Sequence, residues 1–535
     1  LAMGKGTCQH ALIAGKTGSG KSTLFHVMIT NLALWCDPDQ VEFYLIDFKK
    51  GVEFKCYADH HLPHARVIAI ESDREFGLSV LQRLDEELKQ RGEKFRKLGV
   101  QDVAGYVKAG GEDPVPRTLL MIDEFQEFFV EDDQISQQAA VLMDRIVRQG
   151  RAFGIHAILG SQTLGGAFTL ARATLGQMVI RIALQCNEAD AYLIMDDTNP
   201  APRMLTRPGE GIYNDSAGAI EANSPFQVVW MTDEGRDSYL ARVEEMAKEK
   251  GLDTKPQVVF EGNAPAHVTD DREVISILRE GPQQGTPRLF LGAPNAIKGP
   301  TEIAFDRQSG SNVMIVGQRD DAVEAMTAIG IRLLKAQMGD KARIVLIDGQ
   351  VSDPNSRSWL KEVVPVFGDK IEVPTSNEIG DKLNELAAEM KARGEEGTAA
   401  DDTTTFIFIL GLQRYKKLRY EEDFSFSLEE SGEDAKPSDS LNDLICEGAA
   451  LGFHVIVSLD TYNNVNRCVS RKALAEFEKK VLFQMSAADS ASLIDSGKAS
   501  DLGMNRALYY NEPTGVVELF RPYAQPELDW FREED

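Results

Sequence analysis

The sequence has no apolar run that approaches the roughly 18 to 20 residues needed to cross a bilayer. It also has few cysteines, and the 6 that are present are scattered, with no two at the CxxC spacing typical of a zinc site. This pattern favours a reducing compartment. The first residues, LAMGKG, do not form a signal peptide. We therefore expect a cytoplasmic location, with any attachment to a membrane made by regions outside this fragment.

Positive charge is outnumbered, because 58 lysines and arginines stand against 84 aspartates and glutamates and leave a formal net charge of −26. An acidic chain does not attract nucleic acid through its overall field, although a ring-shaped motor can grip a polymer with a local basic lining. Charge therefore disfavours DNA binding without excluding it. The 535 residues are too many for one core and suggest roughly two to four domains. Since the first strand begins almost directly after LAMGKG, we expect a longer protein with further N-terminal regions.

A phosphate-binding loop pattern, GKTGSGKST, follows the apolar run ALIA near the start of the chain. Its glycines let backbone N–H groups curl around a triphosphate, Lys21 supplies a positive charge, and the Ser22 hydroxyl is a ligand for Mg²⁺. ATP and Mg²⁺ are therefore the predicted cofactors. The alternative, a glycine-rich turn without nucleotide, is disfavoured by the strand before it and the amphipathic segment after it. The predicted nucleotide contacts are Gly15, Lys16, Thr17, Gly18, Ser19, Gly20, Lys21, Ser22 and Thr23.

A second chemical signature, RTLLMIDE, occupies residues 117–124. Four consecutive apolar residues predict a buried parallel strand, and two carboxylates stand at its end. Asp123 is placed to hold Mg²⁺ directly or through water, and Glu124 to orient and deprotonate the attacking water. The pair makes ATP hydrolysis, rather than nucleotide binding alone, the leading hypothesis.

A further apolar strand at residues 157–160 ends in a polar group that includes Gln162. Such a side chain faces the γ-phosphate position, so Gln162 is the predicted sensor of ATP against ADP. Arg151, just ahead of the strand, is either an ordinary surface arginine or a finger that reaches a neighbouring subunit's nucleotide, and spacing alone does not decide. His156 is most simply a buried structural histidine. Lys49, after the strand at residues 41–47, is expected in a solvated turn rather than at a substrate.

These motifs together resemble the motor domain of the FtsK/SpoIIIE family of translocating ATPases, in the HerA/FtsK superfamily, from about residue 10 to residue 214. The matching segments are GKTGSGKS, IDEF, GRAFGIHAILGSQ, LGVQDVAGY at 98–106 and MVIRIALQ at 178–185. The resemblance implies a RecA-like core, hexameric rings and ATP sites shared between subunits. The family's arginine falls on Arg151, which favours the finger. One segment departs, because DFKKGVEF at 47–54 is more similar to the EccC ATPases of type VII secretion than to chromosome translocases, which tend to carry a DPK version.

The second half of the chain is a diverged repeat of the first. Residues 251–287 are rich in glycine and proline and predict a linker between an active ATPase domain at 1–250 and a degenerate one at 288–535. The apolar strands recur as SNVMIVG, RIVLID, TFIFILGLQ and GAALGFHVIVSLDT. Each chemical residue is replaced: Val323 stands for Lys21, Glu324 for Ser22, Leu410 for Asp123, Gly411 for Glu124, Ala449 for Arg151 and Asp460 for Gln162.

We therefore predict an α/β protein with tandem RecA-like P-loop NTPase domains, each a mostly parallel sheet flanked by helices, the second degenerate. Asp320, Asp321 and Glu324 would repel a triphosphate there, so this domain is not expected to hydrolyse ATP. The arrangement again resembles the EccC pattern of one active module and later inactive ones.

Three functions compete at this stage. The first is a ring motor that moves double-stranded DNA, the second an EccC-like motor that moves or unfolds protein, and the third a scaffold whose assembly is gated by nucleotide. Glu124 and Arg151 disfavour the scaffold, the acidic charge disfavours DNA, and the motif match favours descent from DNA translocases. On the sequence alone we favour a DNA translocase that forms a homo-oligomer, a hexameric ring, with a protein substrate as the alternative.

Overall fold

The computed structural model describes residues 3–4, 6–49, 53–165, 172–196, 198–252, 255–262, 264–282, 284–351, 353, 355–396, 402–420 and 436–532. The chain forms two compact units, Leu1–Gly262 and Asn263–Asp535. Their boundary lies inside the range 251–287 that composition predicts as a linker, but that range also contributes strand β9 to the first unit and helix α9 to the second. Within the described residues, no helix is both long and apolar enough to cross a membrane.

The first unit is built on a nine-stranded sheet with the order β8-β7-β6-β1-β5-β4-β2-β3-β9. Neighbours from β6 to β9 pair in parallel, whereas β7 and β8 extend the other edge as antiparallel strands. The strands are β1 (Ala11–Ala14), β2 (Val41–Asp47), β3 (Ala65–Ile70), β4 (Arg117–Asp123), β5 (Ile155–Ser161), β6 (Ile180–Ala183), β7 (Glu210–Asn214), β8 (Ser224–Gln227) and β9 (Val258–Glu261).

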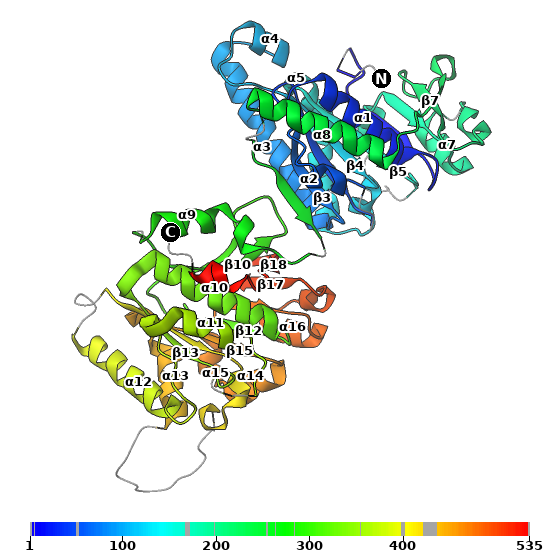
Figure 1. The fold of residues 1–535 in the computed structure, drawn as a ribbon. Helices are drawn as coiled ribbons and strands as arrows, with labels where there is room; N and C mark the ends of the chain where they lie inside the picture. Colours follow the sequence, from blue (N-terminus) through cyan, green and yellow to red (C-terminus); the bar gives the residue numbers. More distant parts are fainter. Residues whose placement is uncertain are drawn as a thin grey trace, which may run out of the picture. The chain divides into compact units, whose positions relative to one another are not determined.

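Helices cover both faces of this sheet. The helices are α1 (Lys21–Trp35), α2 (Lys55–Asp59), α3 (Arg74–Leu98), α4 (Val103–Lys108), α5 (Gln134–Phe153), α6 (Arg172–Gly176), α7 (Glu188–Ile194) and α8 (Asp233–Lys250). On one face α1 and α8 lie side by side and bury Phe25 and Leu240 against Ile13 (Figure 1). The order of strands turns back after β3, so right-handed crossovers place α3 and α5 on the opposite face. The ends of β1, β2, β4 and β5 therefore meet at one edge, where α/β sheets bind ligands.

The second unit repeats this plan. Its sheet has the order β11-β10-β18-β17-β16-β12-β15-β14-β13, in which β16-β12-β15-β14-β13 matches β6-β1-β5-β4-β2 and the β17–β18 hairpin matches β7–β8. The strands are β10 (Arg288–Pro294), β11 (Thr301–Ala304), β12 (Val313–Val316), β13 (Ala342–Ile347), β14 (Thr404–Ile409), β15 (Phe453–Leu459), β16 (Lys479–Leu482), β17 (Ala507–Asn511) and β18 (Val516–Pro522). The predicted fold class, with its tandem units, is confirmed.

The helices of the second unit also form two layers. They are α9 (Arg272–Glu280), α10 (Asp320–Met338), α11 (Leu360–Phe367), α12 (Ile379–Glu396), α13 (Pro437–Glu447), α14 (Tyr462–Cys468), α15 (Arg471–Ala475), α16 (Ala487–Ile494) and α17 (Leu528–Arg532). Residues of α10 and α11 pack on one side of the sheet with Ile315, and residues of α12 and α13 pack on the other with Met314 (Figure 1). The alternating burial of neighbouring strand residues is that of a sheet covered on both faces.

Two buried histidines show that the repeat extends to individual contacts. His156 Nδ1 lies 2.9 Å from the carbonyl oxygen of Gln9, and His454 Nδ1 lies 2.8 Å from that of Ser311. Burial lowers the pKa of both imidazoles to about 4, so both are neutral near pH 7. Each neutral ring can donate Nδ1–H to that carbonyl and so link the start of the first strand to the strand beside it, which confirms the structural interpretation of His156.

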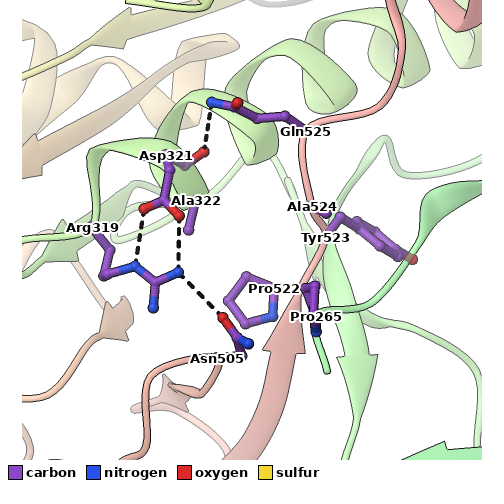
Figure 2. Close-up of a pocket in the computed structure, with 9 residues that line it drawn as sticks. All are labelled: Pro265, Arg319, Asp321, Ala322, Asn505, Pro522, Tyr523, Ala524 and Gln525. Carbon is purple, nitrogen blue, oxygen red and sulfur yellow. Dashed lines mark hydrogen bonds and ion pairs between the residues drawn. The ribbon is translucent and has the colours of Figure 1, made fainter. Parts of the chain in front are cut away.

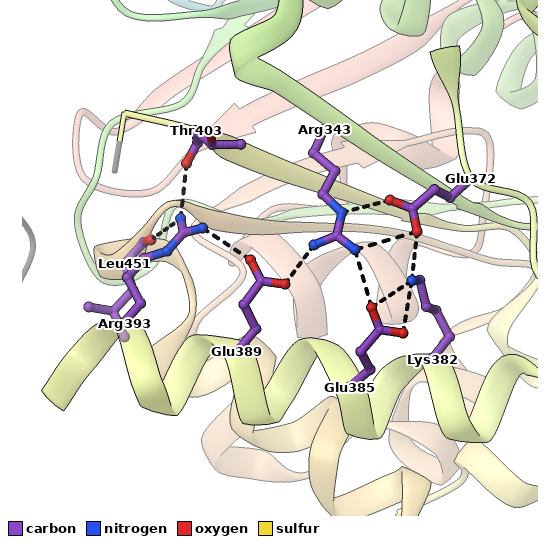
Figure 3. A network of polar contacts seen from close by, with 8 residues as sticks. All are labelled: Arg343, Glu372, Lys382, Glu385, Glu389, Arg393, Thr403 and Leu451. Atoms are coloured by element: carbon purple, nitrogen blue, oxygen red, sulfur yellow. Dashed lines mark hydrogen bonds and ion pairs between the residues drawn. The ribbon is translucent and has the colours of Figure 1, made fainter. Parts of the chain in front are cut away.

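Strand β13 is the last strand of the second sheet, and charged side chains of α12 face it (Figure 3). Arg343 on β13 donates to Glu372 and Glu389, each at 2.6 Å, while Lys382 pairs with Glu372 at 2.6 Å and Glu385 at 2.9 Å. The backbone of Glu372 also bonds to β13. Edge strands need such cover because their free N–H and C=O groups otherwise invite pairing with another chain.

Candidate active site

The predicted phosphate loop joins β1 to α1. Gly18 and Gly20 have φ of 79° and 98°, in the left-handed region that favours glycine. A Cβ on Gly15 would lie 2.4 Å from Ser19 Oγ and 3.0 Å from Leu184 Cβ, so a larger residue here would force these side chains to move. The Gly15 N–H donates to the carbonyl oxygen of Ser161 at 3.1 Å, which ties the loop to the end of β5.

Lys21, the first residue of α1, pairs with both predicted acids. Its ammonium contacts Asp123 Oδ1 and Glu124 Oε1, and all three side chains are at most 5% exposed. Burying three charges is costly unless they neutralise one another, and a lysine between two carboxylates does so only in part. The cluster therefore keeps a net negative charge that a divalent cation beside it would balance.

Glu124 is held in a strained conformation. Its φ of 59° and ψ of 51° are left-handed, which is uncommon for a residue other than glycine. Its Oε2 accepts hydrogen bonds from Gln126 Nε2 at 2.7 Å and from the backbone N–H of Gln162 at 2.9 Å. Burial raises the pKa of Glu124, but the charge of Lys21 and these bonds outweigh burial and leave the pKa below its usual value. The carboxylate is thus ionised and fixed in orientation.

Asp123 has a different electrostatic environment from its neighbour. Burial raises its pKa against the opposing effect of Lys21, and the negative charge of Glu124 adds to the rise. It lies beside Asp47, its register partner on β2, whose pKa burial raises to about 7. Burial disfavours the ionised form of both carboxylates. A bound cation would stabilise that ionised form and so offset the effect of burial.

Gln162 joins the same site from the end of β5. Its Oε1 accepts a hydrogen bond from Thr17 Oγ1 at 2.9 Å, so a side chain of the phosphate loop and the predicted sensor contact each other directly. Ser161, the residue before it, donates to Gln126 Oε1 at 2.7 Å. Residues 161–162 are therefore linked to Glu124 in two ways, through Gln126 and through the backbone N–H of Gln162. A displacement of either segment would disturb the hydrogen bonds of the other.

Arg151 lies apart from this cluster. It is an exposed residue in the last turn of α5 and does not line the cavity at the phosphate loop. The unit thus brings together the loop, Asp123, Glu124 and Gln162, but not the predicted arginine finger. A finger that acts in trans would have this exposure, and so would an ordinary surface arginine.

A cavity of about 570 Å³ opens at the phosphate loop. The residues that line it are Lys16, Thr17, Gly18, Gly20, Lys21, Ser22, Thr23, Lys49, Glu53, Asp123, Gln162, Pro208, Gly209, Gln227, Val228, Val229 and Trp230. Lys49 is among them, and it is exposed in a bend after β2, as expected for a solvated turn, while its place in the lining puts it within reach of a ligand in the cavity. Lys49 carries the positive charge that a phosphate site uses.

Two parts of the lining were missed by sequence reasoning. Glu53 lies beside Ser22, and hydrogen bonds from His26 and Ser22 lower its pKa. His26 is in turn bonded to Tyr57 through Nδ1 at 2.7 Å. The other part comes from the two residues before β7 (208–209) and from the end of β8 with the segment after it (227–230). No motif marks either part, although glycine at 209 has a φ of 79° that only the folded hairpin explains.

The site fits magnesium and a nucleoside triphosphate. A glycine loop at a helix N-terminus offers backbone donors to phosphate oxygens, and Lys21 and Lys49 add positive charge. Ser22, Asp123 and Glu53 supply the oxygen ligands, direct or through water, that Mg²⁺ prefers. The cavity volume lies within the range of ordinary small-ligand sites. These residues would hold the cation and the phosphates, and the hairpin wall would meet the rest of the nucleotide.

The matching place in the second unit has a shortened loop. Residues 15–20 separate β1 from α1, whereas only residues 317–319 separate β12 from α10. The backbone N–H groups that would cradle phosphate are therefore partly wound into the helix. The cavity there is about 140 Å³, and Figure 2 shows that in its lining Arg319 is bonded to Asp321 and Asn505, and Gln525 to the backbone of Asp321.

Internal ion pairs and hydrogen bonds fill the rest of that place. Arg319 pairs with Asp321 at 2.9 Å, and Arg414 pairs with Asp320 at 3.1 Å. Glu324 accepts hydrogen bonds from Ser358 Oγ at 2.7 Å and Gln525 Nε2 at 3.2 Å. We expected these acids to repel a triphosphate. The structure adds that they already have partners within the protein, so a nucleotide would have to break existing contacts as well as overcome repulsion.

Comparison with known proteins agrees with this picture. Residues 2–165 match the model of the FtsK/SpoIIIE family. The ESX-5 secretion system protein EccC5 of Mycobacterium marinum is 35% identical over 192 residues, which are 34% of this chain and 13% of EccC5. The DNA translocase FtsK of Streptococcus agalactiae is 30% identical over 229 residues, which are 41% of this chain and 26% of FtsK. The chain thus matches only a small part of each relative's length, and the first unit carries an ATPase domain of FtsK/SpoIIIE type.

Solved structures resemble the chain over both units. ATPases 2 and 3 of Thermomonospora curvata EccC, in complex with a signal sequence peptide, superpose with a TM-score of 0.60 at 16% identity, covering 98% of this chain and 90% of that one. ATPases 2 and 3 of EssC from Geobacillus thermodenitrificans give a TM-score of 0.55 at 15% identity, covering 96% and 91%. At such low identity the likeness establishes the fold alone, a tandem pair of α/β units.

Proposed function

We propose that the chain is the ATP-hydrolysing part of a motor of FtsK/SpoIIIE type, with its single active site in the first unit. The observation that carries the proposal is Glu124, a strained and buried carboxylate that is held ionised in an ion pair with Lys21, the lysine that also contacts Asp123. Strain of this kind persists only where the surrounding structure enforces it, and it concentrates at functional sites.

Each residue has a role in this proposal. Lys21 and the loop amides bind the β and γ phosphates, and Ser22 and Asp123 hold Mg²⁺, which supplies charge neutralisation at the phosphates when it is bound. Glu124 accepts a proton from the attacking water, since its carboxylate is ionised and its orientation is fixed by Gln126 and by Gln162. Gln162 senses the γ phosphate through its contact with Thr17. Arg151 completes the site of a neighbouring subunit in a homo-oligomer, a hexameric ring.

For the substrate we favour a protein chain. The structural likeness to EccC, one of whose structures is a complex with a signal sequence peptide, runs through both units, while in sequence the match to EccC5 covers 34% of the chain and the match to FtsK 41%. The net charge of −26 also disfavours a polyanion. Double-stranded DNA, which the sequence motifs alone led us to favour, is the second candidate, supported by the 30% identity to a DNA translocase.

The ATPase rate in the presence of linear duplex DNA distinguishes the two substrates. If the substrate is a protein, the ATPase rate is the same with and without duplex DNA at every salt concentration. The Glu124→Gln chain provides the background rate of ATP hydrolysis. With DNA as substrate, duplex raises the rate at about 50 mM salt, and the rise collapses by about 200 mM as phosphate contacts are screened. The second result would overturn our preference while leaving the ATPase assignment intact.

A further inference from the structure

One wall of the nucleotide cavity is tied to the phosphate loop through the backbone. The N–H of Gly209 donates to the carbonyl oxygen of Ser19 at 2.9 Å, and the N–H of Val228 donates to that of Gly209 at 2.8 Å. A Cβ on Gly20 would lie 3.3 Å from Gly209 Cα, so the two backbones are nearly in contact. The hairpin wall, residues 208–209 and 227–230, is therefore held at a fixed distance from the loop that binds phosphates.

The hairpin wall also carries Trp230, whose indole ring is exposed to solvent. Trp230 lines the cavity and is 79% exposed, and Val229 beside it is 67% exposed. Tryptophan is usually well buried, so an exposed one at the mouth of a cavity is informative. Its ring offers a flat face of the kind on which nucleic-acid bases stack.

The orientation of Gln227 on this wall can be assigned. Its Nε2 donates to the carbonyl oxygen of Pro208 at 3.2 Å, and because a carbonyl only accepts, the amide nitrogen must be on that side. The Oε1 of Gln227 is left as a hydrogen-bond acceptor in the lining of the cavity. Adenine carries an amino donor at its sixth position, where guanine carries an oxygen acceptor.

The second unit treats its corresponding aromatic residue differently. After β18, the strand that matches β8, Tyr523 is 1% exposed and its hydroxyl donates to Asp271 at 2.7 Å. Its ring is therefore part of the core and is not available to a ligand. Only the unit that keeps Lys21 and Glu124 has an aromatic face open beside its loop, among the residues that the structure describes.

We propose that the hairpin wall is the base-binding subsite of the first unit, where Trp230 stacks on the base and Gln227 selects adenine over guanine. The proposal rests on nucleotide binding at the phosphate loop and adds the part of the ligand that the motifs do not identify. In this proposal the loop binds the phosphates and the hairpin wall binds the base. The backbone hydrogen bonds of Gly209 connect the two elements.

Binding of ADP, GDP and inorganic tripolyphosphate to the full chain, measured by calorimetry, tests the proposal. Trp230→Ala should raise the Kd for ADP roughly 5- to 150-fold, the range expected for one stacked base, and leave the Kd for tripolyphosphate unchanged. Trp230→Phe should restore most of the ADP affinity. Gln227→Ala should bring the Kd values of ADP and GDP together. Trp35→Ala is the matched control, since Trp35 is 86% exposed on α1 and does not line the cavity.

The fluorescence of Trp230 gives a second readout. ADP should quench the indole emission of the parent chain and of Trp35→Phe but not that of Trp230→Phe, and tripolyphosphate should quench none of them. An unchanged ADP Kd in Trp230→Ala would overturn the proposal, as would equal weakening of ADP and tripolyphosphate, which would indicate a distorted loop. If the parent bound neither ligand, the proposed ATPase function itself would have failed.

Discussion

Glu124 and Gly411 occupy the same turn in the two units, and both are left-handed, with φ of 59° and 64°. Glu124 directly follows β4 and precedes a short 3₁₀ helix, η1 (Phe125–Phe129). Gly411 lies two residues after the end of β14 and precedes the 3₁₀ helix η7 (Leu412–Arg414). Both units therefore require a left-handed residue at this position. The conformation is strained in the first unit because the residue there is a glutamate. Where no carboxylate is needed for chemistry, glycine adopts the turn without strain.

Substituting Gly411 should reveal the strain that Glu124 carries. Gly411→Ala should lower the free energy of unfolding of the second unit by about 1 to 2 kcal/mol, the cost of a left-handed residue with a Cβ. Gly411→Asn is the control, because asparagine tolerates this conformation and displaces Arg414 in the same way. Calorimetric unfolding of the full chain measures both. Equal stability of the alanine and glycine chains would show that the turn relaxes freely.

Lys21 and Glu124 should separate nucleotide binding from turnover. Lys21→Ala leaves Asp123 and Glu124 as neighbouring negative charges where phosphates must sit, so ATP binding should be lost. Glu124→Gln keeps the loop and Asp123, so ATP should still bind while phosphate release falls roughly 10²- to 10⁴-fold, the usual contribution of a general base. Calorimetry and a phosphate-release assay measure the two effects. A Glu124→Gln chain that hydrolyses ATP at the parental rate would rule out Glu124 as the base.

Arg151 should act on the site of another subunit. Arg151→Ala should lower the ATPase rate of the assembled ring roughly 10³- to 10⁵-fold, as expected for an arginine finger. Arg148→Ala is the matched control, since Arg148 is exposed on the same helix and already paired with Asp144 at 2.8 Å. Mixing Arg151→Ala chains with Lys21→Ala chains should restore part of the activity, because some interfaces then contain both intact residues. No recovery in mixed rings of verified composition would argue against a shared site.

The second unit should bind no ATP. Its loop is wound into α10, and Arg319 and Arg414 are paired with Asp321 and Asp320. The parent chain should therefore bind a single ATP, and Lys21→Ala should bind none at micromolar concentrations, as measured by equilibrium dialysis with labelled ATP and Mg²⁺. A stoichiometry of two in the parent would mean that the second site is active in binding.

The charged network around Arg343 predicts a dependence of stability on pH. Burial raises the pKa of Glu372, but Arg343 and Lys382 lower it further, so the folded pKa lies below the unfolded one. This stabilisation is present above the unfolded pKa of about 4.3 and is lost as the pH falls through the folded pKa. Arg343→Met should be less stable at pH 7 and should lose less on acidification. Parallel curves of unfolding free energy against pH for the two chains would contradict the assignment.

Local pattern was enough to predict the loop, the acids and the sensor, because each lies at the end of an apolar strand. The hairpin wall could not be predicted that way. Gly209 and Trp230 are far from Gly20 in sequence, and their role depends on backbone hydrogen bonds that form only when β7 and β8 join the sheet. Strand β9 was also missed, because it lies in a range rich in glycine and proline. It pairs with β3, which is distant in the sequence. Long-range pairing of this kind leaves no local signature.

The closed cradle of the second unit bears on how such a copy can evolve. Val323→Lys alone would place a lysine beside a loop too short to hold phosphate and acids already neutralised by Arg319 and Arg414. A carboxylate at position 411 would in addition have to tolerate the left-handed turn that glycine now occupies at no cost. No single substitution along this path would bring a gain in catalysis, so selection has nothing to act on at the first step. On our proposal that this half of the chain does not hydrolyse ATP, regaining hydrolysis would take several substitutions at once.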